Sequence, residues 1–192
     1  GAVVNTGQVP PGSSAMIVGL GGVGLSALLG CRASGANPLI AVDVHQHKLD
    51  LAMELGATAT VNAKDSDAIE QVRELTKGGV EFAFEFAGSV AAMQLAYGAT
   101  RRGGTTITAS LPHPDAEWPL KQISLVAEER TVKGSYIGSC IPSRDLPRYL
   151  DLYKAGHLPI NRLIGKKYRL EEINEGFDSL ASGNSLRDLI IF

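Results

Sequence analysis

The chain has 192 residues, which suits one domain of ordinary size with an additional segment. Hydrophobic residues make up 44% and charged residues 20%, a composition typical of a globular protein rather than a disordered one. A formal net charge of −2 argues against nucleic acid or anionic lipid as partners, and no apolar run is long enough for a membrane-spanning helix. Two isolated cysteines, Cys31 and Cys140, and no recognisable signal peptide predict a cytoplasmic protein. The first residue, Gly1, fits either removal of an initiator methionine or a piece of a longer protein.

Short apolar runs alternate with helix-forming segments through the first 138 residues. Strands are expected at residues 15–19, 39–42, 60–62, 82–85, 105–109 and 131–137. Helices are expected at residues 22–34, 45–55, 68–76 and 90–100, and a proline-containing loop between 110 and 129. Because the strands are apolar on both faces, the sequence predicts an α/β fold with a doubly wound, parallel, six-stranded sheet of the Rossmann type.

The pattern changes after Gly138. A helix with one apolar face is expected after Ser143, followed by a strand at 164–170, a helix at 171–182 and a last strand at 187–192. These elements do not alternate as in a doubly wound sheet. The expected organisation is therefore a Rossmann domain over residues 1–138 and a C-terminal α+β appendage over residues 139–192.

The segment Gly19-Leu20-Gly21-Gly22-Val23-Gly24 is a G-x-G-x-x-G motif between an expected strand and an expected helix. In a dinucleotide site, the first glycine allows a tight turn, the second lets the backbone approach the pyrophosphate, and the third lets helix and sheet pack closely. The helix N-terminus offers free N–H groups to the pyrophosphate. The alternative, a glycine-rich turn that binds nothing, is disfavoured by this context.

Asp43 ends the second expected strand about 20 residues after the motif, where a carboxylate accepts hydrogen bonds from the adenosine ribose. The same carboxylate repels a 2′-phosphate, so the predicted cofactor is NAD rather than NADP. Lys48 is within reach of the ribose, although a solvated surface lysine is an equal alternative. Glu85 is expected to be buried and therefore needs a partner, which the sequence does not identify.

These motifs resemble the medium-chain, zinc-dependent alcohol dehydrogenase family, and the resemblance covers nearly the whole chain. Besides the glycine motif, it rests on Ala41-Val42-Asp43-Val44, Glu54-Leu55-Gly56-Ala57-Thr58, Phe84-Glu85-Phe86-Ala87-Gly88, Lys133-Gly134-Ser135-Tyr136-Ile137-Gly138 and Ile173-Asn174-Glu175-Gly176-Phe177. It implies that Phe86 and Ala87 line the cofactor cleft. It also implies that backbone groups of Ala109, Ser135 and Ile137 hold the nicotinamide carboxamide. Arg187 matches a family arginine that reaches the pyrophosphate, with a surface arginine as the alternative.

The chain departs from this family in its metal ligands. The family's catalytic zinc is held by residues upstream of the cofactor domain, and nothing in this sequence supplies the three ligands required. The resemblance thus implies the NAD(H)-binding portion of an alcohol dehydrogenase, with zinc and the small alcohol or aldehyde handled only in the complete enzyme and no catalytic residue here. A stand-alone NAD-binding module and a zinc-independent reductase remain alternatives.

The expected sixth strand, residues 131–137, lies at a sheet edge if the strand order follows the two-halves Rossmann pattern. An edge strand offers unpaired backbone groups to a second copy. A closed two-fold contact, and so a homodimer, is expected, as the resemblance also implies. The alternative is a monomer whose edge the C-terminal segment covers.

Overall fold

The computed structural model describes residues 1–183 and 185–192. Six parallel strands form the central sheet: β1 (Ala15–Val18), β2 (Leu39–Asp43), β3 (Ala59–Asn62), β4 (Val80–Glu85), β5 (Thr100–Thr108) and β6 (Thr131–Gly134). Their order is β3-β2-β1-β4-β5-β6, and every neighbouring pair is parallel. Every residue of β1 and β2 is buried, which explains why these strands are continuous apolar runs.

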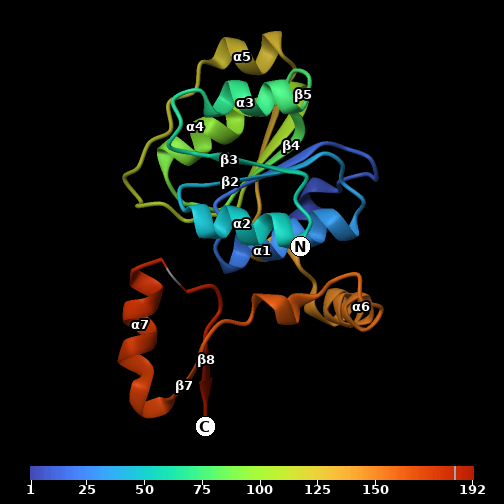
Figure 1. Cartoon of the computed structure of the whole chain (residues 1–192). Coiled ribbons are helices and arrows are strands. Elements are labelled where there is room, and N and C mark those ends of the chain that lie inside the picture. Colours follow the sequence, from blue (N-terminus) through green and yellow to red (C-terminus); the bar gives the residue numbers. More distant parts are fainter. Residues whose placement is uncertain (184) are drawn as a thin grey trace.

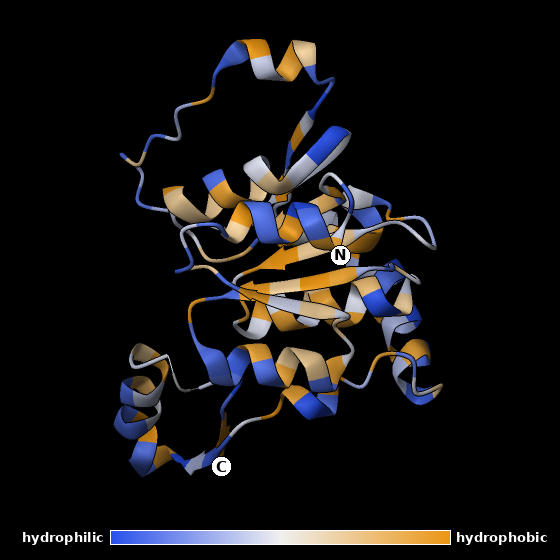
Figure 2. Cartoon of the chain, turned by 45° about the horizontal axis from the view of Figure 1, so that its top comes forward, coloured by the Kyte–Doolittle hydropathy of each residue, from blue (hydrophilic) through white to orange (hydrophobic). Residues whose placement is uncertain are grey.

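Two helical layers cover the sheet (Figures 1 and 2). One layer contains α1 (Gly22–Ala33) and α2 (Gln46–Leu55), and the other contains α3 (Ala68–Leu75) and α4 (Val90–Ala99). Each layer encloses its own apolar core, one around Ile17 and Leu28 and the other around Met16 and Val72. Alternate side chains of β1 therefore enter opposite cores, as the pleat of a strand requires.

Local sequence signals set the C-terminus of α2 and the N-terminus of α4. Gly56 ends α2 with a φ of 108°, a left-handed conformation that glycine adopts at little cost. Ser89 precedes α4, and its hydroxyl accepts a hydrogen bond from the Ala92 N–H at 3.2 Å. Both ends agree with the sequence-based expectation for these helices to within one residue.

The short helix α5 (Gln122–Ala127) lies within the segment expected to be a loop. None of its residues is buried, and its 6 residues are too few to give a clear helical periodicity in the sequence. It is held by Tyr97 of α4, whose hydroxyl is 2.7 Å from that of Ser124. Arg130 and Trp118 pack against the same tyrosine ring, at 4.6 Å and 5.4 Å from its centroid. These contacts come from distant parts of the chain.

The prediction that β6 continues to residue 137 is wrong, because the strand ends at Gly134. The chain then turns into a short 3-10 helix, η2 (Ile137–Ser139), in which Gly138 has a φ of 64°. A left-handed residue cannot continue a strand. The position of β6 at one edge of the sheet agrees with the expectation.

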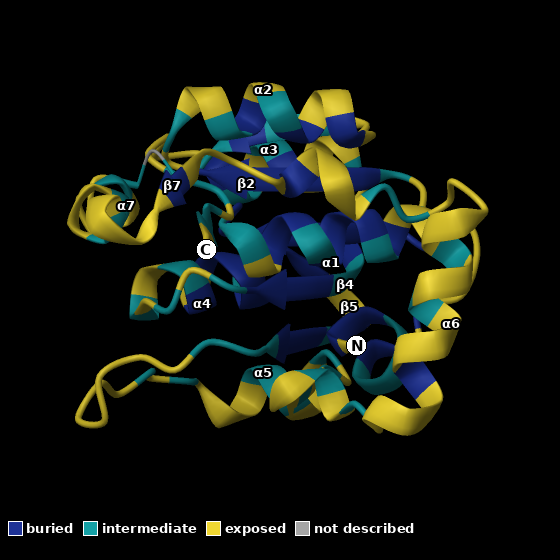
Figure 3. Cartoon of the chain, turned by 90° about the horizontal axis from the view of Figure 1, so that it is seen from below, coloured by how far each residue is buried: buried dark blue, intermediate teal, exposed yellow. Residues whose placement is uncertain are grey.

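The C-terminal segment contains α6 (Pro142–Lys154), the 3-10 helices η3 (Ile160–Leu163) and η4 (Leu170–Glu172), the strand pair β7 (Lys167–Arg169) and β8 (Leu189–Ile191), and α7 (Ile173–Ala181). At the other end, Ala2–Gly7 forms a π-helix, η1, which the sequence did not predict. In Figure 1, α7, β7 and β8 project away from the sheet and its helical layers, and in Figure 3 most of α7 is exposed. None of the described helices is both long and apolar enough to cross a membrane.

Candidate functional site

The carboxyl ends of β1, β2 and β4 meet where the strand order reverses, since β1 has β2 on one side and β4 on the other. In open α/β sheets this switch point leaves a crevice between two diverging connections. The loop after β1 leads into α1, and the loop after β4 leads into α4. Both loops carry residues that the sequence analysis selected.

The three motif glycines have different surroundings. Gly19 has a φ of 89°, and a Cβ on it would lie 2.7 Å from the Ala87 nitrogen. A Cβ on Gly24 would lie 1.8 Å from the Gly19 carbonyl oxygen, so α1 packs on this loop without space for any side chain. A Cβ on Gly21 would meet nothing within 4 Å. Gly19 and Gly24 are therefore needed for packing, whereas Gly21 faces free space at the N-terminus of α1.

Asp43 joins the glycine loop to the end of β2. Its Oδ2 accepts a hydrogen bond from the Leu20 N–H at 2.7 Å, and its Oδ1 accepts one from the His45 N–H at 3.0 Å. Only 8% of the residue is exposed. A carboxylate oxygen can accept more than one hydrogen bond, so the group retains acceptor capacity for a ligand beside the loop.

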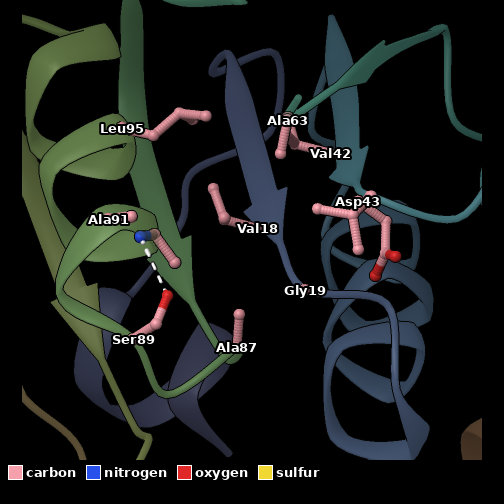
Figure 4. A pocket seen from close by; sticks show the side chains of 11 residues that line it. Val18, Gly19, Val42, Asp43, Ala63, Ala87, Ser89, Ala91 and Leu95 are labelled. Atoms are coloured by element: carbon pink, nitrogen blue, oxygen red, sulfur yellow. Dashed lines mark hydrogen bonds between the residues drawn. The ribbon is translucent and has the colours of Figure 1, made fainter. Parts of the chain in front are cut away.

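A cavity of about 160 Å³ opens between the ends of β1, β2 and β4 (Figure 4). In that view, Asp43 lies on one side, Ala87 and Ser89 lie on the other, and Gly19 is between them. The wall is mainly apolar and contains these residues: Val18, Gly19, Val42, Asp43, Val44, Ala63, Ala87, Ser89, Ala91, Ala92 and Leu95. An apolar slot with one carboxylate at its edge can hold a flat, uncharged ring next to a hydroxylated group.

Glu85 shapes the wall opposite Asp43. The side chain is buried, and its Oε1 accepts hydrogen bonds from the N–H groups of Ala87 and Gly88 at 2.7 Å and 2.6 Å. Its Oε2 accepts one from the Thr108 hydroxyl at 2.8 Å. These are the partners that the sequence could not identify. Thr108 is aligned with Glu85 in the neighbouring strand, so only the sheet register brings the two together.

A second, larger cavity of about 680 Å³ lies between α1, η1, α6 and η3. Five residues selected from the sequence line it: Val23, Phe86, Ala109, Ser135 and Ile137. The Phe86 ring is parallel to that of Phe84, with centroids 6.3 Å apart. The selected residues that line a cavity thus form two groups, with Gly19, Asp43 and Ala87 at the smaller cavity and these five at the larger one. The α1 N-terminus lies between the two groups.

The two remaining basic residues differ in position. A Cβ on Gly22 would lie 3.0 Å from Arg187 Nη2, so this guanidinium lies beside the N-terminus of α1. Lys48 is in the first turn of α2 and is half-buried, but it lines neither of these two cavities, as formed by the described residues.

Within residues 1–183 and 185–192, no three or more His, Cys, Asp or Glu side chains come together as a metal site would require. Both cysteines are free, and burial raises the pKa of Cys31 to about 12, which keeps it a neutral thiol. His45 and His47 lie near each other, with ring centroids 5.6 Å apart.

The contribution of η1 was not predicted from the sequence: its Ala2, Val3 and Val4 line the larger cavity. A run of three small apolar residues has no periodicity that distinguishes it from a core segment. Gly1 and Gly138 pack closely here, because a Cβ on Gly138 would lie 2.7 Å from Gly1 Cα. Only the folded chain brings these ends together.

Comparison with known proteins agrees with this architecture and the predicted fold class. A family model described as zinc-binding dehydrogenase matches residues 22–155. Alcohol dehydrogenase 1 of Oryza sativa subsp. indica is 36% identical over 193 residues, which covers 99% of this chain and 51% of that protein. Alcohol dehydrogenase 1 of Trifolium repens is 38% identical, with 99% and 50% covered. The chain therefore spans about half the length of these curated relatives.

Solved structures give the same result. Benzyl alcohol dehydrogenase from Acinetobacter calcoaceticus superposes with a TM-score of 0.95 at 34% identity, covering 98% of this chain and 52% of that one. An alcohol dehydrogenase zinc-binding domain protein from Burkholderia ambifaria has a TM-score of 0.94 at 35% identity, with 98% and 51% covered. The family model alone matches well over half of this sequence. The chain thus belongs to the zinc-binding dehydrogenase family.

Proposed function

We propose that this chain binds NAD and is the cofactor-binding part of an alcohol dehydrogenase. In the complete enzyme, a hydride would pass between a small alcohol or aldehyde and the nicotinamide ring. The names of the relatives support the reaction class. The order of the two cavities on either side of the α1 N-terminus supports the cofactor, because an extended dinucleotide needs a ring site at each end and a pyrophosphate site between them.

The position of Asp43 is the observation that supports NAD rather than NADP. Its carboxylate is fixed by two backbone N–H groups at the end of β2, beside the free space at Gly21. We assign the adenosine to the smaller cavity, with its ribose hydroxyls on Asp43. A 2′-phosphate would approach this carboxylate at short range, where like charges repel strongly. Lys48, one helical turn further along, is a weaker candidate for the same ribose.

We assign the pyrophosphate to the α1 N-terminus, where Gly21, Gly22 and Val23 begin the helix and Arg187 adds a positive charge. The nicotinamide would then enter the larger cavity between Val23 and Phe86. Its carboxamide would bond with backbone groups contributed by Ala109, Ser135 and Ile137, which lie along the same cavity wall.

The residues that the structure describes do not fit a catalytic zinc ion. An open catalytic zinc site needs three protein ligands, and the described residues bring no such group together. We therefore propose that zinc acts only in the complete parent enzyme, and that this chain holds and orients NAD. Because both cysteines are free thiols, we place the protein in the reducing cytoplasm.

We propose a boundary near residue 138, with residues 1–138 as the NAD-binding domain and residues 139–192 as a segment that completes a catalytic domain. Helix α7 has no buried residue, and Phe177 on it is 60% exposed. Large apolar side chains with this exposure indicate a surface that further protein covers. The half-length match to the relatives is consistent with such a partner domain.

Titration of the 192-residue chain with NADH and NADPH tests the cofactor assignment. We expect NADH to bind at least about tenfold more tightly than NADPH. Asp43→Asn should weaken NADH binding by about tenfold and reduce the preference for NADH over NADPH. An asparagine has only one oxygen that can accept from the Leu20 N–H, the His45 N–H and the ribose, whereas the carboxylate shares these contacts between two oxygens. Asp50→Asn, an exposed α2 carboxylate that accepts from Gln46, is the matched control. Equal binding of NADPH by the wild-type chain would contradict the assignment.

We also propose that two copies pair through β6 to form a homodimer. The Ser135 N–H donates to the Thr108 carbonyl of β5, and backbone groups alternate in direction along a strand. The Val132 N–H therefore points away from β5, toward the free edge of the sheet. Antiparallel pairing of two such edges about a two-fold axis would close on itself and stop at a dimer.

Substitution of Val132 by proline is expected to convert the dimer to a monomer at micromolar concentration, because it removes a donor from the free edge. The Val132→Pro monomer should still be folded, since proline is tolerated in an edge strand where the N–H faces outward. Val132→Ala keeps the N–H and is the control, which should stay dimeric. Sedimentation equilibrium distinguishes these states. A wild-type chain that is monomeric at every concentration would contradict pairing through β6.

A further inference from the structure

The chain turns between β6 and α6 through three successive left-handed residues. Ile137, Gly138 and Ser139 have φ angles of 48°, 64° and 48°. Glycine adopts this region freely, whereas a β-branched residue such as isoleucine rarely does. Ile137 gains no burial in exchange, because it is 74% exposed. Contacts from elsewhere in the chain must therefore hold this turn, here named the 137–139 turn.

Helix η1 supplies those contacts. Asn5 Nδ2 donates to the Gly138 carbonyl at 3.1 Å and to the Ser139 carbonyl at 3.4 Å. The Thr6 hydroxyl is 2.7 Å from the Ser135 hydroxyl and 2.9 Å from the Ser139 hydroxyl. Side chains from the start of the sequence thus fix both the backbone and the hydroxyl groups of the turn.

The Asn5 amide is itself held in one orientation. The Asp145 carboxylate is buried, and its Oδ2 accepts from Asn5 Nδ2 and from the Ile141 N–H, both at 3.0 Å. Arg144 donates to the same carboxylate at 2.6 Å and 2.9 Å, and to Asn5 Oδ1 at 3.4 Å. The hydrogen bond from Arg144 keeps the pKa of Asp145 well below its usual range, so the carboxylate stays charged. Both ends of the amide are therefore engaged.

The 137–139 turn borders the larger cavity. Ser135, Ile137 and Gly138 line this cavity together with Val23 and Phe86. As the first residue of a 3-10 helix, Ile137 has an N–H without an acceptor inside that helix. A strained residue with an exposed side chain and an uncommitted donor at a cavity wall is the pattern expected where the position of the backbone matters for binding.

We propose that Asn5, fixed by Asp145, is a positioning residue that holds the 137–139 turn in its left-handed form. The turn then presents the Ile137 N–H to the carboxamide of the nicotinamide. This inference rests on the proposed function, because it concerns the nicotinamide end of the NAD site. It also gives a role in positioning the nicotinamide to Asn5, which is 133 residues from Gly138 in sequence.

Comparison of NADH with ADP-ribose, which lacks the nicotinamide, tests this role on the 192-residue chain. Asn5→Ala is expected to weaken NADH binding by about tenfold and to leave ADP-ribose binding within about twofold. Adding Ile137→Gly to Asn5→Ala should restore most of the NADH affinity, since glycine adopts the left-handed turn without help. Gln71→Ala is the control, because Gln71 on α3 is also an amide bonded to carboxylates, those of Asp65 and Asp67. It should change neither affinity.

Thr6→Val, nearly the same size, removes only the hydroxyl contacts and gives a second test if Asn5→Ala does not fold. It should weaken NADH by about threefold and spare ADP-ribose. Equal losses for both ligands would indicate a merely structural role and overturn the inference, as would unchanged NADH binding or failure of the glycine rescue. A wild-type chain that binds neither ligand would instead overturn the proposed function, and this inference with it.

Discussion

Alanine at position 24 is expected to lower the melting temperature by about 6–12 °C, equivalent to about 3 kcal/mol for a chain of this size. The new Cβ would lie 1.8 Å from the Gly19 carbonyl oxygen, and neither atom can rotate away, because the backbone fixes the position of a Cβ and the oxygen is itself a backbone atom. Alanine gains about 1 kcal/mol over glycine in helix propensity, but the steric cost is larger. Thermal unfolding followed by circular dichroism measures this change in melting temperature relative to the wild-type chain.

Gly21→Ala is expected to weaken NADH binding and to leave the melting temperature nearly unchanged, the opposite of Gly24→Ala. Gly21 has φ −77° and ψ −170°, which alanine adopts readily, and its Cβ would meet nothing within 4 Å. The melting temperature should stay within about 2 °C, whereas NADH affinity should fall by about a hundredfold, since the methyl group would occupy space assigned to the pyrophosphate. Gly176→Ala, a helical glycine with ordinary contacts on α7, is the control for both variants. Normal NADH binding by Gly21→Ala would refute the assignment of the pyrophosphate.

Among changes outside the glycine loop, removal of the Glu85 carboxylate is expected to lower the stability of the fold most. Glu85→Ala leaves the part-buried N–H groups of Ala87 and Gly88 without their acceptor and removes the Thr108 hydrogen bond. Losing charged hydrogen bonds of this kind costs about 3–4 kcal/mol, so we expect the melting temperature to fall by roughly 6–16 °C. NADH binding should weaken as well, because Ala87 forms one wall of the smaller cavity.

Two further variants define the cause. Glu85→Gln keeps an oxygen for the two N–H groups and should lose only about 1 kcal/mol. Glu54→Ala removes an exposed glutamate that pairs with Arg162 at 3.6 Å, and a surface pair of this kind contributes at most about 1 kcal/mol. If Glu85→Ala melted like Glu54→Ala, the hydrogen bonds of Glu85 would not be what holds the loop after β4.

The elements predicted well from the sequence are those whose signals are local. Strand β1, and β2 up to Asp43, are apolar runs because helices cover both of their faces, and α2 ends at a glycine that takes a left-handed φ. The glycine motif and Asp43 have a fixed spacing along the chain. These features were therefore predictable, including the six-stranded sheet and its edge strand.

The features that were missed depend on contacts between distant residues. Helix α5 is held by Tyr97, the end of β6 is set by a turn that η1 clamps, and Glu85 finds Thr108 only through the sheet register. Glu85 was recognisable as a buried carboxylate, but a single sequence does not reveal which strand lies beside it. Asn5 and Asp145 carried no signal of their own, because an asparagine and an aspartate 140 residues apart form no motif.

The contact between Arg187 and Gly22 has a thermodynamic consequence. It places the C-terminal segment against the start of α1. Docking of this segment is therefore coupled to any binding event at the α1 N-terminus. If a dinucleotide binds at the α1 N-terminus and attracts the guanidinium, then binding also stabilises the docked arrangement of the last residues. Reciprocity requires the converse: whatever stabilises this docked arrangement, such as a neighbouring domain against α7, would raise the affinity for the dinucleotide by the same factor. The C-terminal residues would then act as an effector of the glycine motif.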